Sequence, residues 1–185
     1  DSYTRAGSGD LGRGDIGDDQ AEHKRTDFLT LRDLALGPRQ IDVLARCLKY
    51  WIALTDCDGF RFDTLKHVTF EQARNLCGSV REFAANVGKA NFMLLGEVAG
   101  GDDAEDRYLD ALGRNLSAAL DIGAMRPSLT AVAKGLAPGS DYFAGFDPER
   151  HGAPDPRTTG MGSHRNFGNR HVSVLDDHDH VFGSK

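Results

Sequence analysis

Three carboxylates, Asp63, Glu97 and Asp179, each follow a short segment with a strand-like sequence. Because the carboxyl ends of parallel strands share one edge of an α/β sheet, we expect these three side chains to converge there. A convergence of three carboxylates is typical of a metal site or of glycosidic acid–base chemistry. One carboxylate alone would more often be a helix N-cap or a solvated loop residue, so the interpretation depends on their convergence.

Asp63 and Glu97 have different surroundings in the sequence. Arg61 precedes Asp63 by two residues and shares its face of the strand, where a guanidinium group favours the ionised carboxylate that a nucleophile needs. Glu97 instead follows the apolar segment Met93–Gly96, with no basic residue close by. An apolar setting raises the pKa of a carboxyl group, as a general acid requires. The sequence thus predicts two carboxylates with complementary roles.

The elements that must position these groups alternate between strands and helices. Strands are predicted over 58–63, 92–98, 120–123 and 171–175, and helices over 38–52, 69–87, 104–120 and 128–136. Thr69 and Gln72 form a capping-box pattern at the start of the second helix, and Gly88 is placed to end it. This alternation indicates βα units and a parallel sheet of three or four strands.

Two segments lack such patterns. Residues 1–26 are rich in Gly and Asp and predict a loop or a disordered arm, and residues 137–168 predict a long loop. The N-terminal acidic cluster does not have the spacing of a calcium-binding loop. Trp51 lies on the apolar face of the first helix and is expected in the core.

Composition excludes several classes of protein. With 22 Lys and Arg against 28 Asp and Glu, the net charge of −6 argues against a nonspecific nucleic-acid binder. No segment approaches the roughly 18 apolar residues of a membrane-spanning helix, so no membrane partner is predicted. The three cysteines do not have zinc-ligand spacing, and we expect buried free thiols.

Four segments resemble conserved regions of the α-amylase family of glycoside hydrolases. The second family region reads G-F-R-x-D-x-x-K-H, and Gly59–His67 matches it closely. The third, fourth and fifth regions are similar to Leu95–Val98, Val174–Asp179 and Phe28–Leu34, respectively. The fourth region commonly ends in N-H-D, and Asp177 stands here in place of the Asn.

The resemblance covers about residues 27–182 and implies an α/β fold. That fold would be part of a (β/α)8 barrel, about strands four to seven, truncated at both ends. Residues 27–185 would then form a partial catalytic barrel. Residues 1–26 would be the irregular tail of a loop domain inserted after the third barrel strand.

The resemblance also implies a role for each matching residue. Asp63 would be the nucleophile, Glu97 the acid and base, and Asp179 the residue that holds sugar hydroxyls and stabilises the transition state. Arg61 would orient Asp63, and His178 would bind the same sugar ring. Lys66 and His67 would contact the sugar on the leaving-group side. No metal ligand is assigned to this chain, although the family leaves room for a structural calcium in a longer parent protein.

The leading hypothesis is therefore a retaining hydrolase of α-1,4-linked starch and maltooligosaccharides, with an α-glucan as its partner. A transglycosylase of the same family is the alternative, and the isolated chain is expected to be poorly stable and inactive on its own. The His178-Asp179 pair would also suit a metal-dependent phosphohydrolase, but such enzymes hold that pair on helices. An amylase-like scaffold without activity would lack the three carboxylates, all of which are present here.

Overall fold

The computed structural model describes residues 2–4, 6–10, 13–99, 104–122, 125–144 and 170–180. Four parallel strands form one open sheet in the order β1-β2-β3-β4, with β1 at Gly59–Phe62, β2 at Met93–Gly96, β3 at Ala118–Asp121 and β4 at His171–Ser173. The predicted parallel α/β sheet is confirmed. Its four strands follow their order in the chain, as successive strands of a barrel do.

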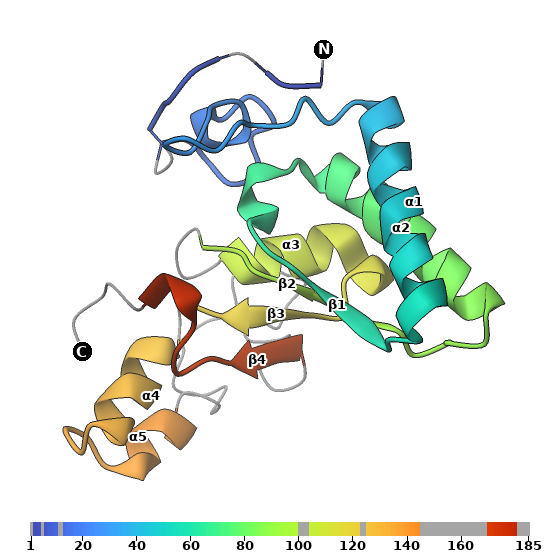
Figure 1. The fold of residues 1–185 in the computed structure, drawn as a ribbon. Helices are drawn as coiled ribbons and strands as arrows, with labels where there is room; N and C mark the ends of the chain where they lie inside the picture. Colours follow the sequence, from blue (N-terminus) through green and yellow to red (C-terminus); the bar gives the residue numbers. More distant parts are fainter. Residues whose placement is uncertain are drawn as a thin grey trace.

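Helices cover this sheet unequally (Figure 1). The helices α1 (Pro38–Thr55), α2 (Phe70–Asn86) and α3 (Ala104–Leu112) lie on one side of it. The shorter α4 (Arg126–Ala133) and α5 (Gly139–Phe143) lie together near the carboxyl ends of β3 and β4. The core fills the space between the first three helices and the sheet, with fully buried Ile52, Val80, Leu94 and Tyr108 among its members.

The second helix has the predicted start. Thr69 accepts a hydrogen bond from the Gln72 backbone N–H, and the Gln72 side chain accepts one from the Thr69 N–H. This capping box satisfies two of the amide groups that a helix leaves unpaired at its N-terminus. The helix then ends just before Gly88, again as predicted.

The third helix is much shorter than its periodicity predicts. The helix α3 ends at Leu112, and Gly113 follows with a φ of +57°, a conformation that favours glycine. A 3-10 turn at Gly113–Asn115 leads directly into β3. The predicted helix over 113–120 is wrong, because the chain enters the fully buried strand β3 at Ala118. A short run of apolar residues does not distinguish a buried strand from a buried helix.

Two expectations about the first helix and the cysteines are wrong. Trp51 is 51% exposed rather than buried in the core. Cys47, on the same helix, is exposed, while Cys57 is half-buried and only Cys77 is fully buried. Both Trp51 and Cys47 lie on the outer side of α1, where no described element covers them.

The N-terminal segment is irregular but well anchored. It contains a 3-10 turn at Glu22–Lys24, and His23 and Lys24 are buried. The Lys24 ammonium donates to the Ile16 carbonyl at 2.7 Å and lies 5.2 Å from the centre of the Phe70 ring. The boundary at residue 26 stays a prediction, and the predicted loop over 137–168 begins with α5 and lies outside the described residues from 145 onward. None of the described helices is long and apolar enough to cross a bilayer.

Candidate active site

The first carboxylate, Asp63, stands immediately after β1. Its Oδ1 forms an ion pair with Arg61 Nη2 at 2.9 Å. Because side chains alternate along a strand, Arg61 and Asp63 emerge on the same face. The Asp63 side chain is half exposed, so a ligand can reach it.

The second carboxylate, Glu97, stands immediately after β2 and is only 7% exposed. One of its oxygens, Oε2, accepts the Thr64 backbone N–H at 2.6 Å. Burial raises the pKa of Glu97, and the Asp63 and Asp179 carboxylates add to this effect, while the Thr64 hydrogen bond and Arg61 oppose it. The direction is the one that a general acid needs.

Backbone pairing fixes the relative positions of these two groups. Phe62 pairs with Gly96 at the ends of β1 and β2. Beyond that pair the ladder continues, since the Glu97 N–H donates to the Phe62 carbonyl at 2.8 Å and the Leu65 N–H donates to the Glu97 carbonyl at 3.0 Å. Asp63 and Glu97 therefore follow two neighbouring strands and lie at the same, carboxyl-terminal end of the sheet.

Thr64 has an unusual backbone conformation between these groups. Its φ of +56° lies in the left-handed region, which costs a non-glycine residue about 1–3 kcal/mol. This conformation directs the Thr64 N–H at Glu97 Oε2. No sequence pattern predicts this contact, because the donor is the Thr64 backbone N–H and not its side chain.

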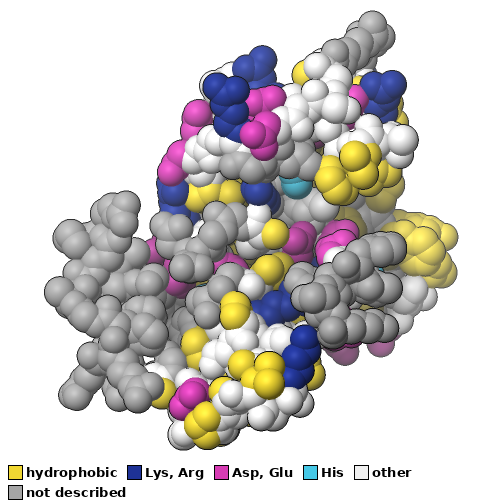
Figure 2. Space-filling model, turned by 90° about the vertical axis from the view of Figure 1, so that its left-hand side faces the viewer, with side chains coloured by type: hydrophobic (Ala, Val, Ile, Leu, Met, Phe, Trp, Pro, Cys, Tyr) yellow, Lys and Arg dark blue, Asp and Glu magenta, His cyan; other side chains and the backbone are white. Residues whose placement is uncertain are grey.

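The third carboxylate, Asp179, follows β4, the strand at the opposite edge of the sheet from β1. In a flat sheet, β1 and β4 would lie about 14 Å apart, given a strand spacing of about 4.8 Å. Yet His178 Nε2 lies 3.8 Å from Asp63 Oδ2 and 3.5 Å from Asp179 Oδ2. The segment after β4 thus crosses the carboxyl ends of the strands and brings His178 and Asp179 close to Asp63. In Figure 2, acidic and basic side chains lie side by side near the centre of this face.

Lys66 and His67 occupy a 3-10 turn, Leu65–His67, that follows Thr64. Burial lowers the pKa of Lys66, and the nearby Glu97 carboxylate opposes that effect. Burial also lowers the pKa of His67, whose Nδ1–H donates to the His23 carbonyl. Of the seven predicted site residues, Arg61 lies within β1 and the other six lie in the segments that follow β1, β2 and β4, with His67 hydrogen-bonded to the N-terminal segment through the His23 carbonyl.

Two further carboxylates at this edge were missed from the sequence. Asp121 ends β3, is 2% exposed, and accepts the Met125 N–H through Oδ1 at 2.9 Å. The predicted strand over 120–123 would place Asp121 within the strand rather than at its carboxyl end. Asp177 was noted only as a departure from the family pattern, whereas the structure pairs it with Arg126 from α4.

Among the described residues, Asp63, His178 and Asp179 form one group that could hold a metal ion, with ligand atoms within 4.8 Å of one another. Calcium prefers six to eight oxygen ligands. This group offers two carboxylates and an imidazole, and the Arg61 guanidinium already binds Asp63. The three residues do not fit a calcium ion, and no cofactor is assigned to the site.

No family model matches the chain, and a search of curated proteins finds no match either. Solved structures do match. An Anoxybacillus alpha-amylase is 28% identical over 59% of this chain and 23% of its own, with a TM-score of 0.51. The chain resembles α-amylases. Amy13B of Eubacterium rectale is 14% identical over 79% of this chain and 27% of its own, with a TM-score of 0.53. A Geobacillus thermoleovorans alpha-amylase, solved with acarbose, is 27% identical over 58% of this chain and 22% of its own, with a TM-score of 0.49.

The similarity to the Anoxybacillus alpha-amylase confirms the resemblance predicted from the four motifs. This similarity and that to Amy13B also confirm that the sheet corresponds to part of an α-amylase-type (β/α)8 barrel, although the four described strands do not close a barrel. The chain spans about a quarter of the length of the α-amylases it matches.

Proposed function

We propose that this chain supplies the catalytic carboxylates of a retaining α-glucan hydrolase. One observation carries the proposal: Asp63 and Glu97 leave adjacent, paired strands at one sheet edge, where His178 reaches Asp63 from β4. One carboxylate is exposed beside a guanidinium, and the other is buried with a raised pKa. Two carboxyl groups in contrasting environments at one site are typical of glycoside hydrolysis.

In the first half-reaction, an Asp63 oxygen would attack the anomeric carbon and form a glycosyl ester. Glu97 would give its proton to the glycosidic oxygen as that bond breaks. Arg61 is ion-paired with the attacking carboxylate at 2.9 Å, and burial raises the pKa of Glu97, which keeps it protonated at higher pH than an exposed glutamate. General acid catalysis of this kind contributes roughly 10²- to 10⁴-fold.

In the second half-reaction, the ionised Glu97 would take a proton from water. The resulting hydroxide would attack the anomeric carbon and release Asp63. Two inversions retain the anomeric configuration, which requires the carboxyl groups to lie about 5–5.5 Å apart. Asp179 and His178 would bind hydroxyl groups of the sugar at the cleavage point.

The substrate that we propose is an α-1,4-linked glucan. Lys66 and His67 complete the K-H end of the motif that starts at Gly59, and they would contact the sugar on the leaving-group side. The similarity to an Anoxybacillus alpha-amylase at 28% identity supports this class of substrate.

The test is product analysis on starch, maltoheptaose and pullulan with the full-length protein that contains this chain. Asp63→Asn and Glu97→Gln should each lower turnover at least 100-fold. Asp42→Asn is the matched control, because Asp42 is an exposed acid paired with Arg46 on α1, and it should keep turnover within twofold. NMR of the first product should show the α-anomer.

Near-normal turnover by either site variant would refute the assignment, as would release of the β-anomer. Products longer than maltoheptaose would instead identify a transglycosylase. Inactivity on all glucans, together with a stoichiometric transition metal, would favour a phosphohydrolase. The isolated 185-residue chain is expected to show little activity, because the described sheet leaves β1 and β4 unpaired at its edges.

A further inference from the structure

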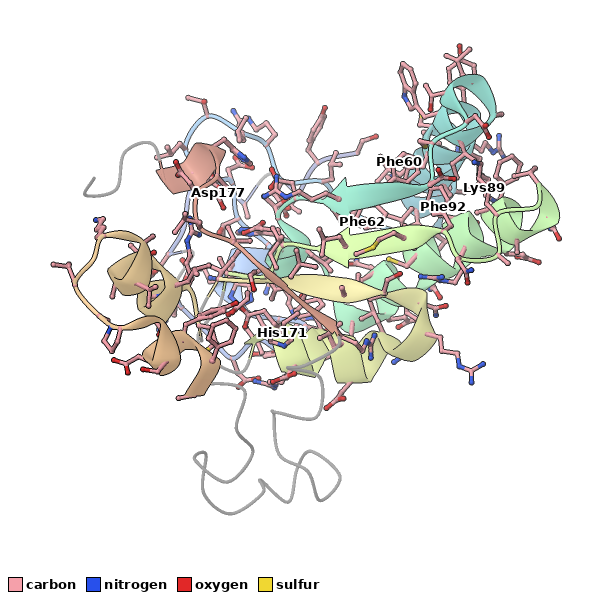
Figure 3. The ribbon with its side chains drawn as sticks, turned by 90° about the horizontal axis from the view of Figure 1, so that it is seen from below. Phe60, Phe62, Lys89, Phe92, His171 and Asp177 are labelled. Atoms are coloured by element: carbon pink, nitrogen blue, oxygen red, sulfur yellow. The ribbon has the colours of Figure 1, made fainter. Side chains whose placement is uncertain are left out.

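The segment that carries His178 and Asp179 is held by an ion pair between Asp177, in the fourth family motif, and Arg126, which lies outside the motifs. Arg126 Nη2 lies 3.4 Å from Asp177 Oδ1. The same Asp177 oxygen accepts the Asp179 backbone N–H at 3.2 Å. One carboxylate oxygen therefore joins a guanidinium group to the backbone of Asp179. Figure 3 shows Asp177 where the chain turns after β4.

Both members of this pair are removed from water. The Arg126 side chain is 5% exposed and that of Asp177 is 14% exposed. Arg126 is the first residue of α4, and the preceding Met125 N–H is bound by Asp121 at the end of β3. The position of Arg126 is thus fixed by β3, the strand next to β4.

Burial makes the two charges dependent on each other. Removing one member of a buried ion pair leaves an uncompensated charge, whereas replacing both members by neutral groups is often harmless. A neutral Asn, the residue common at position 177 in the family pattern, would not need a cation. An aspartate at that position is stabilised by a nearby cation, and the Arg126 guanidinium lies 3.4 Å from its Oδ1.

We propose that Arg126 is a positioning residue for the proposed glycosidase site. It compensates the charge of Asp177, which in turn holds the 178–179 turn so that His178 and Asp179 face Asp63. Arg126 itself touches neither the substrate nor the reacting atoms. This inference rests on the function proposed above, since it concerns how that site is held in place.

The test is a double-mutant cycle in the full-length protein, with kcat and KM measured on maltoheptaose. Arg126→Met removes the guanidinium group that lies 3.4 Å from Asp177 and should lower kcat at least tenfold, since displacements of about 1 Å cost up to about 100-fold. Asp177→Asn keeps an Oδ1 acceptor for the Asp179 N–H and should cost less. The Arg126→Met/Asp177→Asn double variant should recover kcat to within threefold of wild type, because neither charge remains.

The matched control is the exposed pair of Arg46 and Asp42 on α1, whose atoms lie 2.7 Å apart. Arg46→Met, Asp42→Asn and their double variant should leave kcat unchanged. Arg126→Lys keeps the charge and should stay within tenfold of wild type. A double variant as impaired as Arg126→Met would overturn the proposal, since Arg126 would then act independently of Asp177.

Urea unfolding of the same full-length variants separates this inference from the proposed function. Arg126→Met should lower the unfolding midpoint, and the double variant should restore it, whether or not glucans are hydrolysed. Recovery of the midpoint without any wild-type turnover would refute the proposed function and leave the pairing intact. Turnover in the wild type without recovery in the double variant would refute the positioning role alone.

Discussion

Asp33 provides a quantitative test of how the N-terminal segment is stabilised. It lies in the Phe28–Leu34 motif and is partly buried. Burial raises the pKa of Asp33 from 3.8 to about 6, with the Asp27 carboxylate adding to the effect and the Thr4 hydroxyl opposing it. The group is thus an acid whose ionised form the folded state disfavours.

The sign and size of the effect on stability follow from this shift. A folded-state pKa above the unfolded-state value means that the folded state binds more protons, so stability falls as pH rises from about 4 to about 6. A shift of roughly 2 units, at about 1.4 kcal/mol each, corresponds to about 3 kcal/mol. Because the side chain is partly exposed, solvent screening reduces this figure to about 1–2 kcal/mol.

Asp33→Asn should remove this destabilisation. The backbone contacts would remain, with the residue-33 N–H bound to Asp27 Oδ1 at 2.8 Å and its carbonyl bound to the Thr4 N–H at 3.1 Å. We expect the free energy of unfolding to rise by about 1–2 kcal/mol at pH 7 and by less than about 0.6 kcal/mol at pH 4. Urea unfolding followed by circular dichroism at pH 4, 5, 6 and 7 measures both values.

Carboxyl-carbon NMR gives an independent measurement, because the Asp33 signal should titrate near pH 6. The exposed Asp42→Asn variant is the control and should change stability equally little at every pH. A titration near pH 4, together with no gain for Asp33→Asn at pH 7, would refute the reasoning.

Three other predictions concern the sheet and its helices. Glu97→Gln should raise the urea midpoint at pH 7 but not at pH 4, because burial raises the pKa of Glu97 and Gln never ionises; a lower midpoint at pH 7 would contradict this. Gly96→Ala should destabilise the chain by about 1–3 kcal/mol, since the added Cβ would lie 2.7 Å from Leu65 Cδ2. Thr69→Ala should cost about 1 kcal/mol by removing the capping box with Gln72, while Thr69→Ser should keep most of that stability.

Much of the fold was predictable because its signals are local. The helix start at Pro38, the capping box at Thr69 and the apolar strand before Glu97 depend only on neighbouring residues, and all three are observed. The extent of the third helix was not predictable in this way. A left-handed Gly113 ends it, and the apolar residues that follow belong to a buried strand whose neighbours are distant in the sequence.

The sequence by itself determined which groups carry the proposed chemistry. Residue types and spacing selected Arg61, Asp63, Glu97 and Asp179, because strand alternation and the shared carboxyl ends of parallel strands follow from backbone geometry alone. The resemblance to the α-amylase family added His178.

Only the tertiary structure decided how these groups influence one another. The burial of Glu97, the Thr64 N–H that holds it, and the pairing of Arg126 with Asp177 all depend on contacts between segments far apart in the chain. Solvent exclusion and charge compensation are properties of the space around a side chain, and folding must bring the distant strands together before that space exists.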